Sequence, residues 1–127
     1  MGQQVLLDTT VLIAALSSSD TRNLDATELF TSRSKSNFAI STVTFTEALI
    51  RPYALGPIQG ERAERAISEL VADIIPFSSV HAGLAAQLRA KHKTRIPDSM
   101  IIATAIIERL ELISFDRKMI GIYERIK

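Results

Sequence analysis

Short apolar runs alternate along the chain with longer segments of helical periodicity. Four of the runs predict buried strands, at residues 4–7, 38–41, 74–76 and 112–115. Helices are predicted over 9–16, from about 21 to about 33, from 42 or 44 to 51, and over 61–73, 80–91, 98–109 and 117–127. The helix over 98–109 is apolar almost all round, which is typical of a buried helix.

Proline and glycine set several of the predicted boundaries. Pro52 is expected to end the helix that begins near residue 42, and Gly56 with Pro57 is expected to form a loop. Pro97 suits the first turn of the helix that follows it. The alternation of strands and helices predicts an α/β fold of three layers, α/β/α, with a parallel sheet of four to five strands. We find no repeat or linker, and we expect a single domain over residues 1–127.

Composition excludes several classes of site. The chain has 127 residues, of which 46% are hydrophobic and 23% charged, as in an ordinary globular domain. It has no cysteine, which excludes disulfides, thiolate metal sites and cysteine nucleophiles. The first residues lack the basic start and the long apolar stretch that are typical of a signal peptide, and no apolar run approaches the roughly 18 residues of a membrane span. We therefore expect a cytoplasmic protein without membrane contact.

Four acidic residues stand where chemistry is expected. Asp8 follows the first predicted strand and Asp116 the last, and ligands of open parallel sheets bind beyond these strand ends. Asp98 opens the apolar helix, and Glu47 lies in a largely apolar segment. A buried carboxylate is unfavourable unless it is paired or binds a metal ion.

Carboxylates that converge repel one another, and a divalent cation relieves that repulsion. Magnesium and manganese prefer oxygen ligands, and magnesium keeps several waters and substrate phosphates in its shell. Hydrolysis of a phosphodiester is the reaction class that suits such a site best.

Each acid also has a purely structural interpretation. A carboxylate at or before the first turn of a helix can cap that helix or interact favourably with the positive end of its dipole. This interpretation applies to Asp8, Asp98 and Asp116. Glu47 stands three residues after Thr44, which is the spacing of a capping box. Capping and metal binding are compatible, so these interpretations stay open.

Four segments together resemble the motifs of PIN domains: 5–12, 44–49, 96–105 and 112–116. Their order and the chain length are similar to those of VapC-type toxins of prokaryotic toxin–antitoxin pairs. The resemblance implies a homodimeric endoribonuclease that uses Mg²⁺ or Mn²⁺ to cleave RNA. It also implies an antitoxin partner that inserts a segment into the acidic pocket.

By this resemblance the acidic residues are metal ligands, directly or through water, and position the attacking water: Asp8, Glu47, Asp98 and Asp116. The hydroxyls of Thr9 and Ser114 are expected to support them. Two alternatives remain, a PIN domain of RNA processing and a catalytically degenerate binding module. The basic residues Arg117 and Lys118 after Asp116 favour the second of these.

Net charge is only +1, but positive charge gathers in one segment that has no acid. Its members are Arg89, Lys91, Lys93 and Arg95. They are candidates for RNA phosphate contacts, or simply for a solvated helix end. His81 and His92 have no partner at ligand spacing, and we expect neither to bind metal. A phospho-receiver domain is disfavoured because Asp8 alone follows the first strand. The chain also lacks a Gly-rich phosphate loop and a serine nucleophile elbow.

Overall fold

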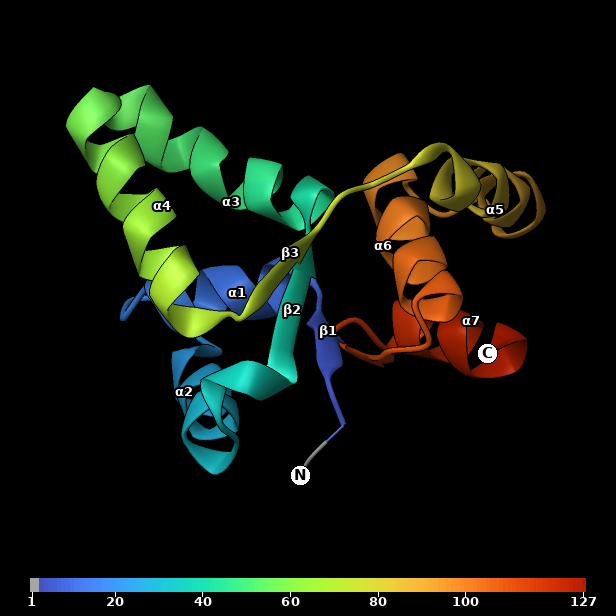
Figure 1. Ribbon diagram of the computed structural model, residues 1–127, viewed down its shortest axis with the longest axis horizontal. Helices are drawn as coiled ribbons and strands as arrows, with labels where there is room; N and C mark the ends of the chain where they lie inside the picture. Colours follow the sequence, from blue (N-terminus) through green and yellow to red (C-terminus); the bar gives the residue numbers. More distant parts are fainter. Residues whose placement is uncertain (1–2) are drawn as a thin grey trace.

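The computed structural model describes residues 3–127, and within them a parallel four-stranded sheet lies between two layers of helices (Figure 1). The strands are β1 (Val5–Leu7), β2 (Phe38–Ser41), β3 (Asp73–Ile75) and β4 (Glu111–Ile113). Their order across the sheet is β3-β2-β1-β4, and every neighbouring pair is parallel. The predicted three-layer α/β architecture is therefore confirmed.

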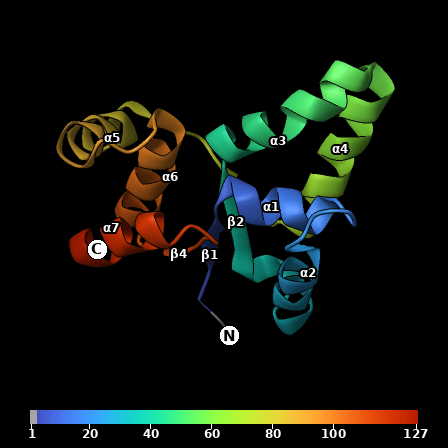
Figure 2. The ribbon, with the colours of Figure 1, turned by 180° about the vertical axis from the view of Figure 1, so that it is seen from behind.

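The side chains of β1 alternate between the two faces of the sheet. Leu6 packs with the helices α5 (Ser79–His92), α6 (Ile96–Ile107) and α7 (Arg117–Ile126). Val5 and Leu7 pack on the opposite side. The helices of that side are α1 (Thr9–Leu16), α2 (Asn23–Ser32), α3 (Thr42–Leu55) and α4 (Pro57–Leu70). Figures 1 and 2 show the two helical groups from opposite directions, with the sheet between them. A short 3-10 turn, Lys35–Asn37, leads into β2.

Helix α6 is buried as its sequence predicts. Ile101, Ile102, Ala103 and Ala105 each have 0% exposure. Because this helix is held on several sides, the position of its first turn is fixed relative to the sheet. That first turn contains Asp98.

The structure corrects the predicted bounds of α3. Pro52 lies inside this helix, which continues to Leu55. Proline removes one helical hydrogen bond, to the carbonyl of Ala48, so tertiary contacts must compensate. Tyr53 supplies them, because its hydroxyl donates to Glu64 on α4 and its ring lies against Gly60.

The expected loop at 56–57 is reduced to one residue, Gly56, between α3 and α4. Gly56 has a φ of 146°, which favours glycine, and Pro57 already starts α4 at a position suited to proline. The helix predicted over 61–73 is therefore Pro57–Leu70. Asp73 is not its last residue but the first residue of β3.

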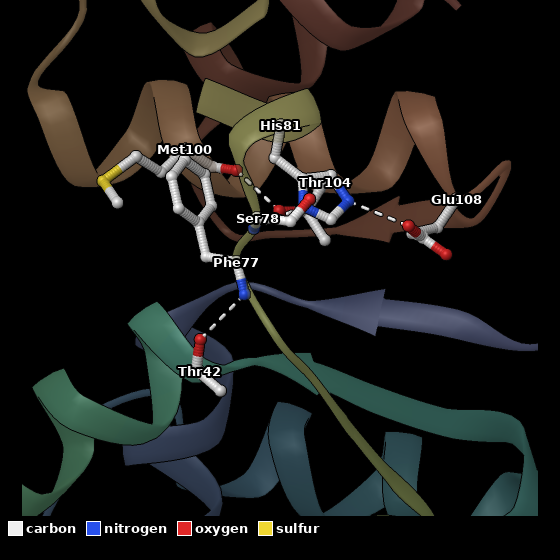
Figure 3. A network of polar contacts seen from close by, with 7 residues as sticks. All are labelled: Thr42, Phe77, Ser78, His81, Met100, Thr104 and Glu108. Atoms are coloured by element: carbon white, nitrogen blue, oxygen red, sulfur yellow. Dashed lines mark hydrogen bonds and ion pairs between the residues drawn. The ribbon is translucent and has the colours of Figure 1, made fainter. Parts of the chain in front are cut away.

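A hydrogen-bonded network joins the two helical layers through the segment between β3 and α5 (Figure 3). The backbone N–H of Phe77 donates to the hydroxyl of Thr42, at the start of α3. The buried ring of His81 accepts the N–H of Ser78 at Nδ1, and its Nε2 lies 2.8 Å from the carboxylate of Glu108. Both ring nitrogens are thus engaged within the protein, and His81 has a structural role.

Among residues 3–127, none of the helices combines the length and the apolar character that crossing a membrane requires.

Candidate active site

Asp8 lies where β1 ends and caps the start of α1. Its side chain is only 2% exposed. Oδ1 accepts the backbone N–H of Thr9 at 2.8 Å, and Oδ2 accepts the hydroxyls of Thr10 and Ser114, each at 2.7 Å. Three donors hold the carboxylate in one orientation. The capping interpretation is thus correct, and it accounts for only one of the three contacts.

Glu47 lies on α3 and faces α1. The hydroxyl of Thr9 donates to its Oε1 at 2.7 Å and lies 3.0 Å from the hydroxyl of Thr44. The capping-box interpretation is wrong, because Thr44 is fully buried inside the helix and Ser41 is the N-cap. The Ser41 hydroxyl accepts the N–H of Val43. Glu47 is therefore oriented by a neighbouring helix and not by its own helix end.

Asp98 is half-buried in the first turn of α6. Burial raises its pKa above the ordinary carboxyl value, and the charge of Arg95 partly lowers it again. The charges of Asp8, Asp116 and Glu47 each raise the pKa further. These charges act on Asp98 from the carboxyl edge of the sheet, where Asp8 follows β1 and Asp116 lies in the connection after β4.

Asp116 is exposed and caps α7. Its Oδ1 accepts the backbone N–H groups of Lys118 and Met119 at 2.9 and 3.3 Å. Strand β4 ends at Ile113, two residues before its predicted end, so Asp116 belongs to the connection and not to the strand end. The hydroxyl of Ser114 accepts the N–H of Asp116 while it donates to Asp8. Ser114 thereby links the first acid to the last.

The donor set of the four acids fits a hard divalent cation, because every group it offers is an oxygen. Within the described part of the chain, no three acidic or histidine side chains already stand close enough to hold an ion. Magnesium tolerates this arrangement, since it commonly binds one or two carboxylates and keeps waters toward the others.

The basic segment divides into residues with different surroundings. Arg89 donates to the carbonyl of Thr94 at 2.5 Å and so closes the turn between α5 and α6. Lys93 ends α5 with a left-handed backbone, and Lys91 is exposed. Arg95 is the member of the segment whose charge acts on Asp98.

Two hollows adjoin the acids. A groove of about 650 Å³ between α1, α3 and α4 includes Glu47 and Arg51. A smaller pocket of about 330 Å³ includes Thr10, Arg22 and Asp116.

Sequence reasoning missed the hydroxyls of Thr10 and Thr44. Both stand within three residues of a singled-out acid, which is the signal that would have found them. For Arg22 the sequence offers no such signal.

Known proteins resemble this chain in sequence and in fold. The family model of the PIN domain matches residues 5–124. A search of curated proteins finds no match. A toxin–antitoxin complex from Klebsiella pneumoniae is similar at 31% identity and a TM-score of 0.74, over 91% of this chain and 88% of that one.

Two further solved structures share the fold. FitAcB from Neisseria gonorrhoeae is 24% identical, with a TM-score of 0.78, over 95% of this chain and 94% of that one. VapC20 from Mycobacterium tuberculosis, a sarcin-ricin loop cleaving toxin, is 16% identical, with a TM-score of 0.78, over 93% of this chain and 94% of that one. Because the family model spans nearly the whole sequence, this chain belongs to the PIN-domain family.

Proposed function

We propose that this chain is a Mg²⁺- or Mn²⁺-dependent endoribonuclease and the toxin of a toxin–antitoxin pair. The observation that carries the proposal is a set of hydrogen bonds at the carboxyl edge of the sheet. Ser114 donates to Asp8 and accepts the N–H of Asp116, and Thr9, next to Asp8, donates to Glu47. Family membership supports a nuclease, and the relatives include a toxin described as cleaving the sarcin-ricin loop. The entire chain would act as one nuclease domain.

Asp8, Glu47, Asp98 and Asp116 would hold the cation, some of them through water. The bound ion would supply Lewis-acid activation of the scissile phosphate and lower the pKa of water. The hydroxyls of Thr10 and Ser114 keep Asp8 oriented. The hydroxyl of Thr9 donates a hydrogen bond to Oε1 of Glu47. In this proposal the other carboxylate oxygen, Oε2, orients the attacking water and accepts its proton.

An antitoxin is the protein partner that we propose, because similar structures are toxin–antitoxin complexes. The groove beside Glu47 is the proposed point of inhibition. Its walls include Leu16, Ala48 and Leu55, with Arg51 near the acid. A partner segment lying there would cover Glu47. We also propose a homodimer, by resemblance to the toxins.

A degenerate binding module is the competing proposal, and the site does not favour it. Among residues 3–127, Asp116 forms no ion pair with Arg117 or Lys118. The carboxylate of Asp116 accepts the backbone N–H groups of Lys118 and Met119. The acid is thus not neutralised by the basic residues that follow it.

The test is cleavage of RNA by the purified protein with Mg²⁺, with Mn²⁺ and with a chelator. Asp98→Asn should lower the rate at least about 100-fold, because it removes a charge that the transition state requires. Glu69→Gln, at an exposed acid of α4, is the matched control and should leave the rate unchanged. Cleavage that persists after Asp8 and Asp98 are both neutralised would overturn the proposal. Calorimetry that detects no binding of either ion at millimolar concentration would favour the binding module.

A further inference from the structure

The small pocket beside Asp116 has a composition different from that of the acidic site. It lies between α1, the segment before α2 and the connection from β4 to α7. It is lined by Thr10, Ile13, Asp20, Arg22, Phe115 and Asp116. Two of these residues connect the pocket to the acidic site. Thr10 donates to Asp8, and Asp116 is both a lining residue of the pocket and one of the four acids. A ligand group in this pocket would therefore sit next to the reacting phosphate.

Arg22 is held in place before any ligand binds. Its guanidinium carbon lies 3.8 Å from the centre of the Phe115 ring, and its Nε donates to Asp25 at 2.8 Å. The side chain is still 47% exposed. The guanidinium thus lies over an aromatic ring while almost half of the side chain is exposed, so part of it is accessible to a base. Flat guanidinium groups stack on nucleobases as aromatic rings do.

Charge decides what kind of group the pocket accepts. Asp20 and Asp116 place two carboxylates in it, whereas the single cation, Arg22, is already paired with Asp25. A second phosphate of the RNA would meet net negative charge there. A neutral base meets no such penalty, and Ile13 and Phe115 offer it apolar contact.

Asp20 supplies a group that can read the edge of a base. Its Oδ1 accepts the backbone N–H of Arg22 at 2.8 Å, which orients the carboxylate. The second oxygen is left as an acceptor for the amino group of a base. Carboxylates accept from the amino groups of bases, and uracil has no amino group.

We propose that this pocket is a nucleobase subsite, in which a base next to the cleaved bond stacks on Arg22 and donates an amino group to Asp20. The inference rests on the proposed RNA cleavage and adds a source of sequence preference to it. Arg22 is a specificity-determining residue in this proposal, and Phe115 positions it.

The first test measures binding without cleavage, so it stands apart from the proposed function. Adenosine, guanosine, cytidine and uridine are titrated into the whole protein, and the ring resonances of Phe115 are followed by NMR. We expect the three amino-bearing nucleosides to shift these resonances more than uridine does. Arg22→Ala should weaken this binding about 10-fold. Arg33→Ala, at an arginine that pairs with Glu111 away from the pocket, is the control.

Inorganic phosphate is titrated in parallel. If phosphate shifts the Phe115 resonances and the nucleosides do not, the pocket is an anion site and the proposal is overturned. It is equally overturned if neither ligand has an effect, or if Arg22→Ala binds nucleosides as the wild type does.

The second test uses cleavage of a randomised RNA pool, with sequencing of the new ends. We expect the wild type to disfavour uracil at one position beside the cut and Asp20→Asn to lose this discrimination while it still cleaves. Asparagine keeps the oxygen that accepts the Arg22 N–H. If the pool is not cleaved by the wild type, the proposed function fails and the nucleoside titration alone decides the subsite. If Arg22→Ala lowers cleavage equally for all sequences, Arg22 contacts phosphate and the subsite is excluded.

Discussion

The hydroxyl of Ser114 donates to Oδ2 of Asp8 at 2.7 Å, although the two residues are 106 positions apart. The same hydroxyl accepts the backbone N–H of Asp116 at 2.9 Å. One small side chain thus fixes the distance between the acid that follows β1 and the acid that caps α7. Groups that orient metal-binding carboxylates act on metal affinity although they do not touch the ion.

Ser114→Ala should therefore lower metal affinity or the cleavage rate about 10- to 100-fold, without abolishing either. The measurement is cleavage as a function of Mn²⁺ concentration, together with calorimetry of Mn²⁺ binding. Ser114→Thr keeps a hydroxyl and should retain most of the affinity. Ser68→Ala, at an exposed serine of α4, serves as the control. Wild-type Mn²⁺ dependence in Ser114→Ala would show that Asp8 does not depend on this hydrogen bond.

Thr9→Val tests the link between α1 and α3. Valine has nearly the same shape but leaves Glu47 and the buried hydroxyl of Thr44 without their partner. We expect a loss of stability of about 1–3 kcal/mol and a cleavage rate lowered about 10- to 100-fold. Urea denaturation and cleavage assays measure the two effects separately. Thr9→Ser should restore both, and the idea fails if serine and valine behave alike.

The sequence pattern predicted the elements whose bounds depend on local signals. Helix α1 covers residues 9–16 and β2 covers residues 38–41, as expected. Asp8 caps the start of α1, and β2 is a short apolar run that ends at Ser41, the N-cap of the next helix. The error at Pro52 has a non-local cause. Tyr53 packs on Gly60 of the next helix and so allows α3 to continue past a proline. No local pattern contains that contact.

The same division applies to the site. The convergence of Asp8 and Asp98 is a prediction from the sequence, based on parallel strands and a buried helix. The contact between Arg22 and Phe115 joins a helix start to a loop near the other end of the chain. It depends on side-chain direction, and neither residue stands in a periodic pattern that indicates a partner.

The pKa of Asp98 gives a prediction about stability and pH. Burial raises this pKa, as do the neighbouring acids, although Arg95 partly opposes them. A carboxyl group that holds its proton more tightly in the folded state destabilises the fold when it ionises. That penalty is present above the raised pKa, and it disappears as the pH falls toward and below the ordinary value of 3.8.

Asp98→Asn should therefore melt at a higher temperature than the wild type at pH 7 in a chelator, by no more than a few degrees because the side chain is half-exposed. The difference should shrink as the pH is lowered. Saturating Mg²⁺ should raise the melting temperature of the wild type more than that of Asp98→Asn, because a ligand stabilises the state that binds it. Glu69→Gln should show neither effect. A melting temperature of Asp98→Asn below that of the wild type in chelator would contradict the assigned direction of the pKa.

Two glycines in helices provide a matched pair for the contact between α3 and α4. A Cβ added at Gly60 would lie 2.2 Å from Cδ1 of Tyr53, whereas one added at Gly83 would meet nothing within 4 Å. Gly60→Ala should thus lower stability by about 1–3 kcal/mol through overpacking, because the ring of Tyr53 must move. Gly83→Ala should raise stability by about 0.5–1 kcal/mol, because alanine is the better helix former. Urea denaturation measures both. If Gly60→Ala also gains stability, then Tyr53 does not hold α3 against α4, and the continuation of α3 beyond Pro52 needs another cause.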